Sequence, residues 1–261
     1  IFIQPAAGDA GGAIGAALTV WHRRFGGGRM PKMDHAFLGT DYAGEEIEAV
    51  LRKHGLPFEK LTDTDLLETT AGLLTGENVV GWFQGRMEFG PRALGNRSIL
   101  ADARNPENWR KVNLKIKFRE SFRPFAPTVP AERVSDYFDF DVESPFMLLV
   151  ADVLPHRRSE IPAVTHVDGS ARIQTIRRDQ NPRYYDLLKA FERRTGCPVI
   201  INTSFNVRGE PIVESPADAI NCFLHTQMDY LVLGNCLLKK SDMANASPEG
   251  QERYLQQFAS D

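Results

Sequence analysis

The sequence predicts an α/β protein in which a mixed sheet is packed by helices, and three observations lead to this class. Short apolar runs typical of buried strands alternate with segments of helical periodicity, most clearly in the second half of the chain. The chain has 261 residues, enough to bury a sizeable core. Its hydrophobic share of 42% and charged share of 25% are ordinary for a globular protein.

The first half of the chain contains four predicted helices and one predicted strand. Residues 8–25 (GDAGGAIGAALTVWHRRF) suit a helix that begins with small residues. Residues 44–55 have acids in the first turn, bases in the last and Gly55 at the C-cap, and residues 63–76 show the same pattern more weakly. The apolar run 78–85 predicts a buried strand. Residues 105–117 begin with an Asn N-cap followed by Pro, which predicts another helix.

The second half alternates between strands and helices. Strands are predicted at 146–153, 170–176, 197–202 and 230–234, and helices at 183–196 and 215–226. The helix at 183–196 is supported by one apolar face and by a glycine at its end: Tyr184, Leu187, Leu188, Phe191 and Gly196.

The order of the segments predicts two units, a short N-terminal piece and a main domain, with a helical connection between them and a tail at the end. Residues 1–30 form a short N-terminal piece, 31–76 a helical connection, 77–245 the main α/β domain and 246–261 a C-terminal tail. The chain starts without an initiator Met and on an apolar stretch, so we expect a cut through a longer protein. The three cysteines form no CxxC pair, and no apolar run reaches the ~20 residues of a membrane helix. The default location is therefore a reducing cytoplasm.

Positive charge is focused although the net charge is −3. In residues 85–98 (GRMEFGPRALGNRS), Arg86, Arg92 and Arg97 alternate with glycines. Glycine lets backbone N–H groups face a ligand, and guanidinium groups bind phosphate or carboxylate with two hydrogen bonds. The alternative is surface ion pairing. Three arginines at regular spacing after a buried strand favour an anion pocket with Arg92 in its wall.

Two further segments carry groups that could bind an anion. Lys117 and Arg119, in KIKFRESFRPFAP, place a point charge beside a guanidinium fork, although a helix end with solvated bases is an equal alternative. Residues 199–210 (VIINTSFNVRGE) end a buried strand in Ser204 and Asn206, where α/β folds place ligands, or where a turn uses its own polar groups. Arg172 enters a predicted strand and needs a partner or a ligand.

Metal binding has little support in the residues alone. Asp9 stands at a glycine-rich helix start, where a carboxylate is commonly an N-cap. The six histidines form neither an HxxxH nor an HExxH pattern.

Five segments together resemble the carbamoyltransferases of the NodU/CmcH type: QPAAGDAGGAIGAAL, GRMEFGPRALGNRSILAD, VNLKIKFRESFRPFAPTV, HVDGSARIQTI and PVIINTSFNVRGEPIVESPADAI. The resemblance implies a YrdC-like twisted mixed sheet flanked by helices, preceded by a remnant of an actin-like ATPase domain similar to TsaD. It implies that this lobe uses carbamoyl phosphate and ATP with Mg²⁺ to form carbamoyl-adenylate. The carbamoyl group then passes to a hydroxylated small-molecule acceptor in the N-terminal lobe of the same polypeptide.

The resemblance also implies roles for particular residues. Lys117 and Arg119 match the family's K-x-R element, and Ser204 and Asn206 match its S-x-N element. Arg172 and Met147 match residues that line the carbamoyl phosphate and nucleotide pocket, and Arg92 matches an arginine near the adenylate. We expect Lys117, Arg172 and Ser204 to be catalytic, with Arg92, Arg119, Met147 and Asn206 binding substrate or nucleotide.

The N-terminal lobe would contribute the remaining parts of the enzyme. Asp9 matches an acidic metal ligand whose histidine partners lie upstream, in a lobe that holds a divalent metal, with iron as a candidate. We therefore expect this chain alone to transfer no carbamoyl group to an acceptor.

A YrdC-like RNA-binding or nucleotide-binding module is the alternative function. It would use aromatic side chains between the basic residues, such as Phe118, Phe122 and Phe125, as stacking platforms. The basic region is compact and the chain as a whole is acidic, so nucleic acid is the less favoured partner.

Overall fold

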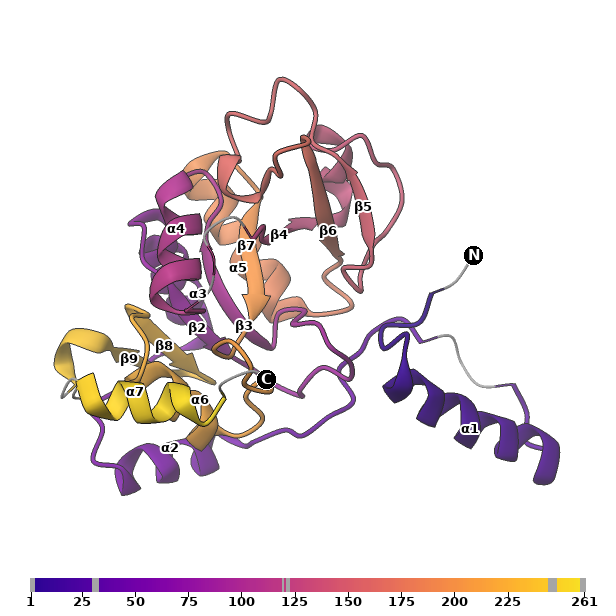
Figure 1. Ribbon diagram of the computed structural model, residues 1–261, viewed down its shortest axis with the longest axis horizontal. Helices are drawn as coiled ribbons and strands as arrows, with labels where there is room; N and C mark the ends of the chain where they lie inside the picture. Colours follow the sequence, from indigo (N-terminus) through magenta and orange to yellow (C-terminus); the bar gives the residue numbers. More distant parts are fainter. Residues whose placement is uncertain (1–2, 30–32, 119, 121–122, 244–247, 259–261) are drawn as a thin grey trace.

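The fold is described from a computed structural model that covers residues 3–29, 33–118, 120, 123–243 and 248–258 (Figure 1). Within these ranges, one mixed sheet runs in the order β1-β9-β8-β2-β3-β7-β4-β6-β5. Its strands are β1 (Glu59–Lys60), β2 (Val80–Phe83), β3 (Arg97–Asp102), β4 (Ala126–Pro130), β5 (Leu149–Asp152), β6 (Ser170–Ile176), β7 (Ile200–Ser204), β8 (Tyr230–Leu233) and β9 (Cys236–Lys239).

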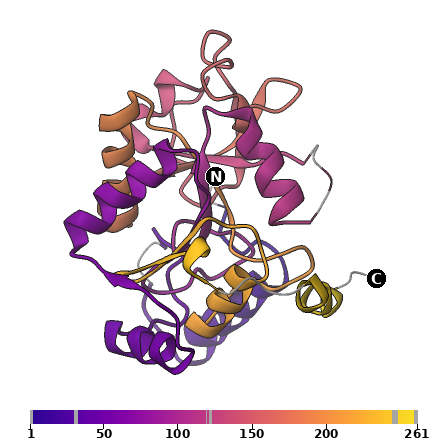
Figure 2. The ribbon, with the colours of Figure 1, turned by 90° about the vertical axis from the view of Figure 1, so that its left-hand side faces the viewer.

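Helices cover both faces of this sheet (Figures 1 and 2). In chain order, the helices of the described residues are α1 (Asp9–Arg24), α2 (Gly44–Lys53), α3 (Asp63–Thr75), α4 (Pro106–Lys115), α5 (Pro182–Thr195), α6 (Pro216–Leu224) and α7 (Pro248–Gln256). The mixed α/β class, with helices flanking a single sheet, is confirmed in the described residues.

The central strands supply both cores because successive side chains point to opposite faces. Ile99 and Ile201 pack in one cluster with α2, α4 and α6, whereas Leu100 and Ile200 pack in the other with α3 and α5. The apolar run of residues 199–201, which leads into β7, follows from burial on both faces.

The structure adds strands that the sequence analysis did not predict. All of β3 is buried at the centre of the sheet, where it pairs antiparallel with both β2 and β7. Strand β4 contains Pro127 and Pro130, which normally argue against an inner strand, yet it pairs with β6 and β7. The pairings with β6 and β7 join residues far apart in the sequence, so no local sequence pattern predicts these strands.

The segment expected as a helical connection contributes to the main sheet. Strand β1 pairs antiparallel with β9, and Leu66 and Leu74 of α3 lie in the same buried cluster as α5. Helix α1, by contrast, extends away from the sheet and most of its side chains are exposed (Figure 1). The actin-like remnant at residues 1–30 stays a prediction.

Candidate functional site

Strand register brings polar side chains of three strands onto one face of the sheet. Asn202 of β7 is the register partner of Ala126, and Gln174 of β6 is the partner of Thr128. The Asn202 amide donates to Gln174 Oε1 at 2.7 Å, so the two side chains share a face. Arg172, which precedes Gln174 by two positions on β6, and Ser204, which follows Asn202 by two on β7, lie on this face as well.

A cavity of about 280 Å³ opens above this face. Its wall comes from five segments: the loop before β3, the start of β4, the segment before β5, strand β6 and the end of β7. The lining residues are Pro91, Arg92, Ala93, Arg123, Pro124, Phe125, Ala126, Met147, Arg172, Asn202, Thr203 and Ser204. The structure therefore brings together Arg92, Met147, Arg172 and Ser204, which the sequence placed in one site.

Arg92 reaches the cavity from a loop whose backbone is held by the carboxylate of Glu88, a residue of the same loop. Glu88 is buried, and its Oε1 accepts backbone N–H groups from Leu94 at 2.7 Å, Asn96 at 2.8 Å and Arg97 at 3.3 Å. These three backbone amides therefore bind a carboxylate of the protein itself. Within the described chain, the buried Nε of Arg92 has no hydrogen-bond partner.

Arg97 corrects the expectation that all three loop arginines face an anion. Its side chain is completely buried, and its guanidinium carbon lies 3.5 Å from the centroid of the Phe83 ring. The guanidinium donates to backbone carbonyls of Thr40, Gln84, Gly85, Asn96 and Glu214 at 2.6–3.4 Å. Burial lowers its pKa to about 10, so it stays charged at neutral pH in a structural role. The third arginine, Arg86, is exposed and donates to Leu38 O at 3.4 Å.

Met147 and Arg172 meet across the cavity wall. The Arg172 Nη2 lies 3.9 Å from the Met147 sulfur. Met147 is buried and has a φ of +55°, a conformation that is uncommon for residues other than glycine. Such backbone strain is found preferentially where a side chain is held in place for function.

Lys117 is buried and forms a cluster with the half-buried Ser204 and Asn206 next to the cavity. Its ammonium donates to the backbone oxygen of Ser204, to Ser204 Oγ at 3.2 Å, to Asn206 O at 2.9 Å and to Asn206 Oδ1 at 2.6 Å. Ser204 Oγ also donates to Asn206 Oδ1 at 2.7 Å. Ser204 belongs to both this cluster and the cavity wall, so the two adjoin. Arg119, the other member of the K-x-R pair, lies outside the described residues.

The oxygens of this cluster do not fit a protein-bound Mg²⁺. Ser204 Oγ and Asn206 Oδ1 are neutral acceptors that already take the Lys117 ammonium, whereas Mg²⁺ is usually held through carboxylates and phosphates. In the described residues, no group of three His, Cys, Asp or Glu side chains is placed to hold a metal ion. The side chain of Asp9 lies outside what the structure describes, so its expected role as a ligand stays a prediction.

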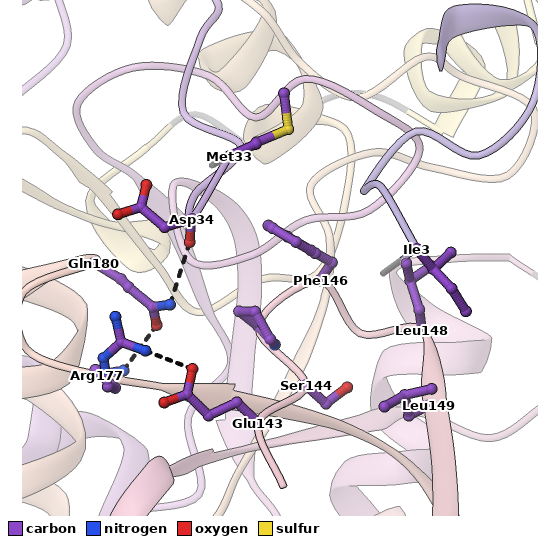
Figure 3. A pocket seen from close by; sticks show the side chains of 11 residues that line it. Ile3, Met33, Asp34, Glu143, Ser144, Phe146, Leu148, Leu149, Arg177 and Gln180 are labelled. Carbon is purple, nitrogen blue, oxygen red and sulfur yellow. Dashed lines mark hydrogen bonds and ion pairs between the residues drawn. The ribbon is translucent and has the colours of Figure 1, made fainter. Parts of the chain in front are cut away.

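A larger cavity of about 460 Å³ is lined by Phe146 and Leu148, the neighbours of Met147, and is mainly apolar (Figure 3). Phe146 and Leu148 point into it, whereas Met147 lines the smaller cavity. Its one arginine, Arg177, pairs with Glu143 at 2.5 Å and with Asp179 at 3.0 Å. Because this charge is already balanced, the larger cavity is the poorer anion site.

The aromatic residues of the basic segment do not form a stacking surface in the described part of the chain. Phe125 is buried, and Phe118 packs against the core. Phe122 lies outside the described residues. Phe118 and Phe125 therefore do not offer exposed rings for stacking on bases.

Two residues of the cavity and one beside it were present in the analysed motifs but had no assigned role. Arg123 and Asn202 line the wall, and Gln174 supports Asn202 from below. Asn202 is 1% exposed, and its Oδ1 has no hydrogen-bond partner in the described chain. The sequence did hold one signal for Asn202: it is a polar residue that directly follows the apolar run 199–201, near the carboxyl end of a predicted buried strand.

The chain is similar to proteins of one family along most of its length. Residues 71–240 match the family model described as Carbamoyltransferase C-terminus. The chain is 52% identical to the uncharacterized protein sll1178 of Synechocystis over 100% of this chain and 46% of that protein. It is 44% identical to nodulation protein NolO of Bradyrhizobium diazoefficiens over 92% of this chain and 44% of that protein. The chain is 36% identical to a 3'-hydroxymethylcephem-O-carbamoyltransferase of Amycolatopsis lactamdurans over 84% of this chain and 40% of that protein.

The chain thus spans less than half the length of these curated relatives. Among solved structures, it is similar to full-length HypF in the phosphate- and nucleotide-bound form, with a TM-score of 0.45 and 18% identity over 65% of this chain and 25% of that one. A similarity this low does not transfer a fold or a site. In the described chain, the helices are all too short or too polar to cross a membrane.

Proposed function

The chain belongs to the carbamoyltransferase C-terminal family, and on that premise we propose that it binds and activates the carbamoyl donor for an ATP-dependent O-carbamoyl transfer. The donor is carbamoyl phosphate, and the product of this lobe is carbamoyl-adenylate. The final acceptor is a hydroxylated small molecule, and its recognition belongs to the rest of the polypeptide.

One observation carries this proposal: arginines from three separate segments, Arg92, Arg123 and Arg172, line the same small cavity. Arg92 comes from the loop before β3 and Arg172 from β6, so only the fold brings them together. Paired arginines bind phosphate oxygens in a fixed geometry. Asn202 Oδ1 adds an acceptor for a carbamoyl N–H. A volume of about 280 Å³ is at the lower end for small-molecule sites, which favours a compact phosphorylated compound.

The adjoining Lys117 cluster is the proposed place for the nucleotide phosphates. Lys117 Nζ and Ser204 Oγ are one hydrogen bond apart, so a phosphate that contacts Ser204 also approaches a buried positive charge. In the proposed reaction, water first cleaves carbamoyl phosphate to carbamate and inorganic phosphate. A carbamate oxygen then bonds to the α-phosphorus of ATP, and pyrophosphate leaves. Reactions of this type depend mainly on positioning and on fixed positive charge, and they need no protein nucleophile. Any Mg²⁺ would be bound by the phosphates themselves.

Pyrophosphate release that depends on carbamoyl phosphate tests the proposal. We expect Arg172→Ala to weaken the use of carbamoyl phosphate by about tenfold or more, because it removes a charge-assisted contact. Arg193→Ala is the matched control, since Arg193 is an exposed arginine of α5 that pairs with Glu68 away from the cavity. An unchanged dependence on carbamoyl phosphate in Arg172→Ala would contradict the assignment. Failure of the unsubstituted chain to bind carbamoyl phosphate in calorimetry would do the same.

A further inference from the structure

The C-terminal helix α7 is joined to the Lys117 cluster by a continuous series of hydrogen bonds. Tyr254 of α7 is buried, and its hydroxyl donates to Glu210 Oε1 at 2.5 Å. The other carboxylate oxygen of Glu210 accepts from the backbone N–H of Val207 at 2.8 Å. The Glu210 carbonyl accepts from the Asn206 amide at 2.6 Å, which leaves Asn206 Oδ1 directed at Lys117 and Ser204.

The loop between β7 and α6 fits tightly beneath this helix. Gly209 has a φ of +78°, and a Cβ there would lie 2.1 Å from the backbone oxygen of Phe258. The Tyr254 ring stacks on His225 with centroids 4.6 Å apart and meets Phe258 edge-on at 5.3 Å. The hydroxyl of Tyr254 is therefore held in place from two sides, and the loop that carries Asn206 has little room to move.

We propose that Tyr254 and Glu210 are positioning residues that hold Asn206 and Ser204 in register with Lys117. The inference rests on the proposed function, because the cluster they hold is the proposed nucleotide-phosphate site. It assigns a role to a segment expected only as a tail, and it places neither residue in contact with substrate.

The arrangement has a pH dependence whose direction follows from the groups around Glu210. Tyr254 from α7, Cys222 from α6 and Lys117 after α4 face its carboxyl group. Burial raises the pKa of Glu210, while the bonds from Tyr254 and Val207 and the charge of Lys117 lower it again. The ionised carboxylate accepts both donors, whereas protonation turns one oxygen into a competing donor. As the pH falls through this raised pKa, the loop is expected to loosen.

Steady-state pyrophosphate release by the full 261-residue chain, measured from pH 5 to 9, provides the test. Tyr254→Phe keeps the ring contacts and removes only the hydroxyl. We expect the KM for ATP to rise about five- to tenfold, with a smaller change in kcat, since one hydrogen bond to a charged group is lost. The acid limb of the profile should move to higher pH because a bond that lowers the Glu210 pKa is gone. Glu210→Gln should abolish this limb.

Tyr185→Phe is the matched control. It removes the same kind of bond, from Tyr185 to Glu132 Oε1 at 2.5 Å, on the exposed side of α5. We expect its KM and pH profile to equal those of the unsubstituted chain. If the KM and pH profile of Tyr254→Phe also equal those of the unsubstituted chain, the inference is overturned while the proposed function stays intact.

Amide hydrogen exchange separates this inference from the proposed function. If the unsubstituted chain releases no pyrophosphate, the proposed function fails, but exchange at residues 204–210 can still be compared. Faster exchange there in Tyr254→Phe than in Tyr185→Phe would support the positioning role, and equal exchange would reject it.

Discussion

Arg92 and Arg97 carry the same side chain in one loop, but their surroundings give them different tasks. The Arg97 guanidinium is enclosed by five backbone carbonyls and the ring of Phe83. Arg92 lines the cavity and keeps a buried Nε that has no partner in the described chain. Sequence spacing alone could not separate them, because the carbonyls that surround Arg97 come from residues as distant as Thr40 and Glu214.

This difference predicts that the same conservative change lowers stability strongly at Arg97 and hardly at all at Arg92. Arg97→Lys keeps the charge but cannot reach all five carbonyls, so we expect the free energy of unfolding to fall by about 2–3 kcal/mol. Arg92→Lys should change it by less than about 0.5 kcal/mol, because no structural bond to its Nε is lost. Urea unfolding followed by circular dichroism measures both. Equal losses in the two variants would show that Arg97 is not the structural arginine.

The loop that precedes β3 is fixed by close packing as much as by charge. Gly95 has a φ of +111°, and a Cβ there would lie 2.2 Å from Cδ1 of Tyr184 in α5. The Tyr184 hydroxyl donates to Thr128, which donates to Gln174, the residue that supports Asn202 beneath the cavity. The packing at Gly95 is thus connected to Asn202 through Tyr184 of α5, Thr128 of β4 and Gln174 of β6.

Gly95→Ala is therefore expected to lower the free energy of unfolding by about 3 kcal/mol or more, through overpacking added to backbone strain. Gly196→Ala is the control for strain alone, because Gly196 ends α5 with a φ of +72° and nothing lies within 4 Å of its missing Cβ. It should cost about 1–2 kcal/mol. Thermal and urea unfolding of the two variants give the comparison. If Gly95→Ala costs no more than Gly196→Ala, the packing argument is wrong.

The sequence predicted the class of the whole molecule, most of its helices and four members of one cavity. Helix α5 followed from the spacing of Tyr184, Leu187, Leu188 and Phe191, which are all buried. Strands β3 and β4 were missed because their pairing with β7 is long-range. For the site, resemblance grouped Lys117 with Ser204 and Asn206, while the residues alone left a simple turn as an alternative. The role of Tyr254 had no local signal, since only the fold brings α7 to Glu210.

Helix α1 is set apart from the rest of the molecule, and this predicts an unequal response to helix breaking. Its side chains are mostly exposed, including Leu18 at 36% and Trp21 at 45%, whereas Ala190 of α5 is 1% exposed.

Proline inside a helix removes a hydrogen bond and clashes with the preceding turn. Leu18→Pro should therefore lower the helical signal while shifting the Tm by less than about 1 °C, because α1 contributes little burial to the core. Ala190→Pro should lower the Tm by more than about 10 °C, because the buried pairing of α5 with α3 depends on an unbroken helix. Circular dichroism and calorimetry of both variants measure these effects. A large loss of Tm in Leu18→Pro would mean that α1 packs on the sheet domain in solution, which would contradict its separation from the core.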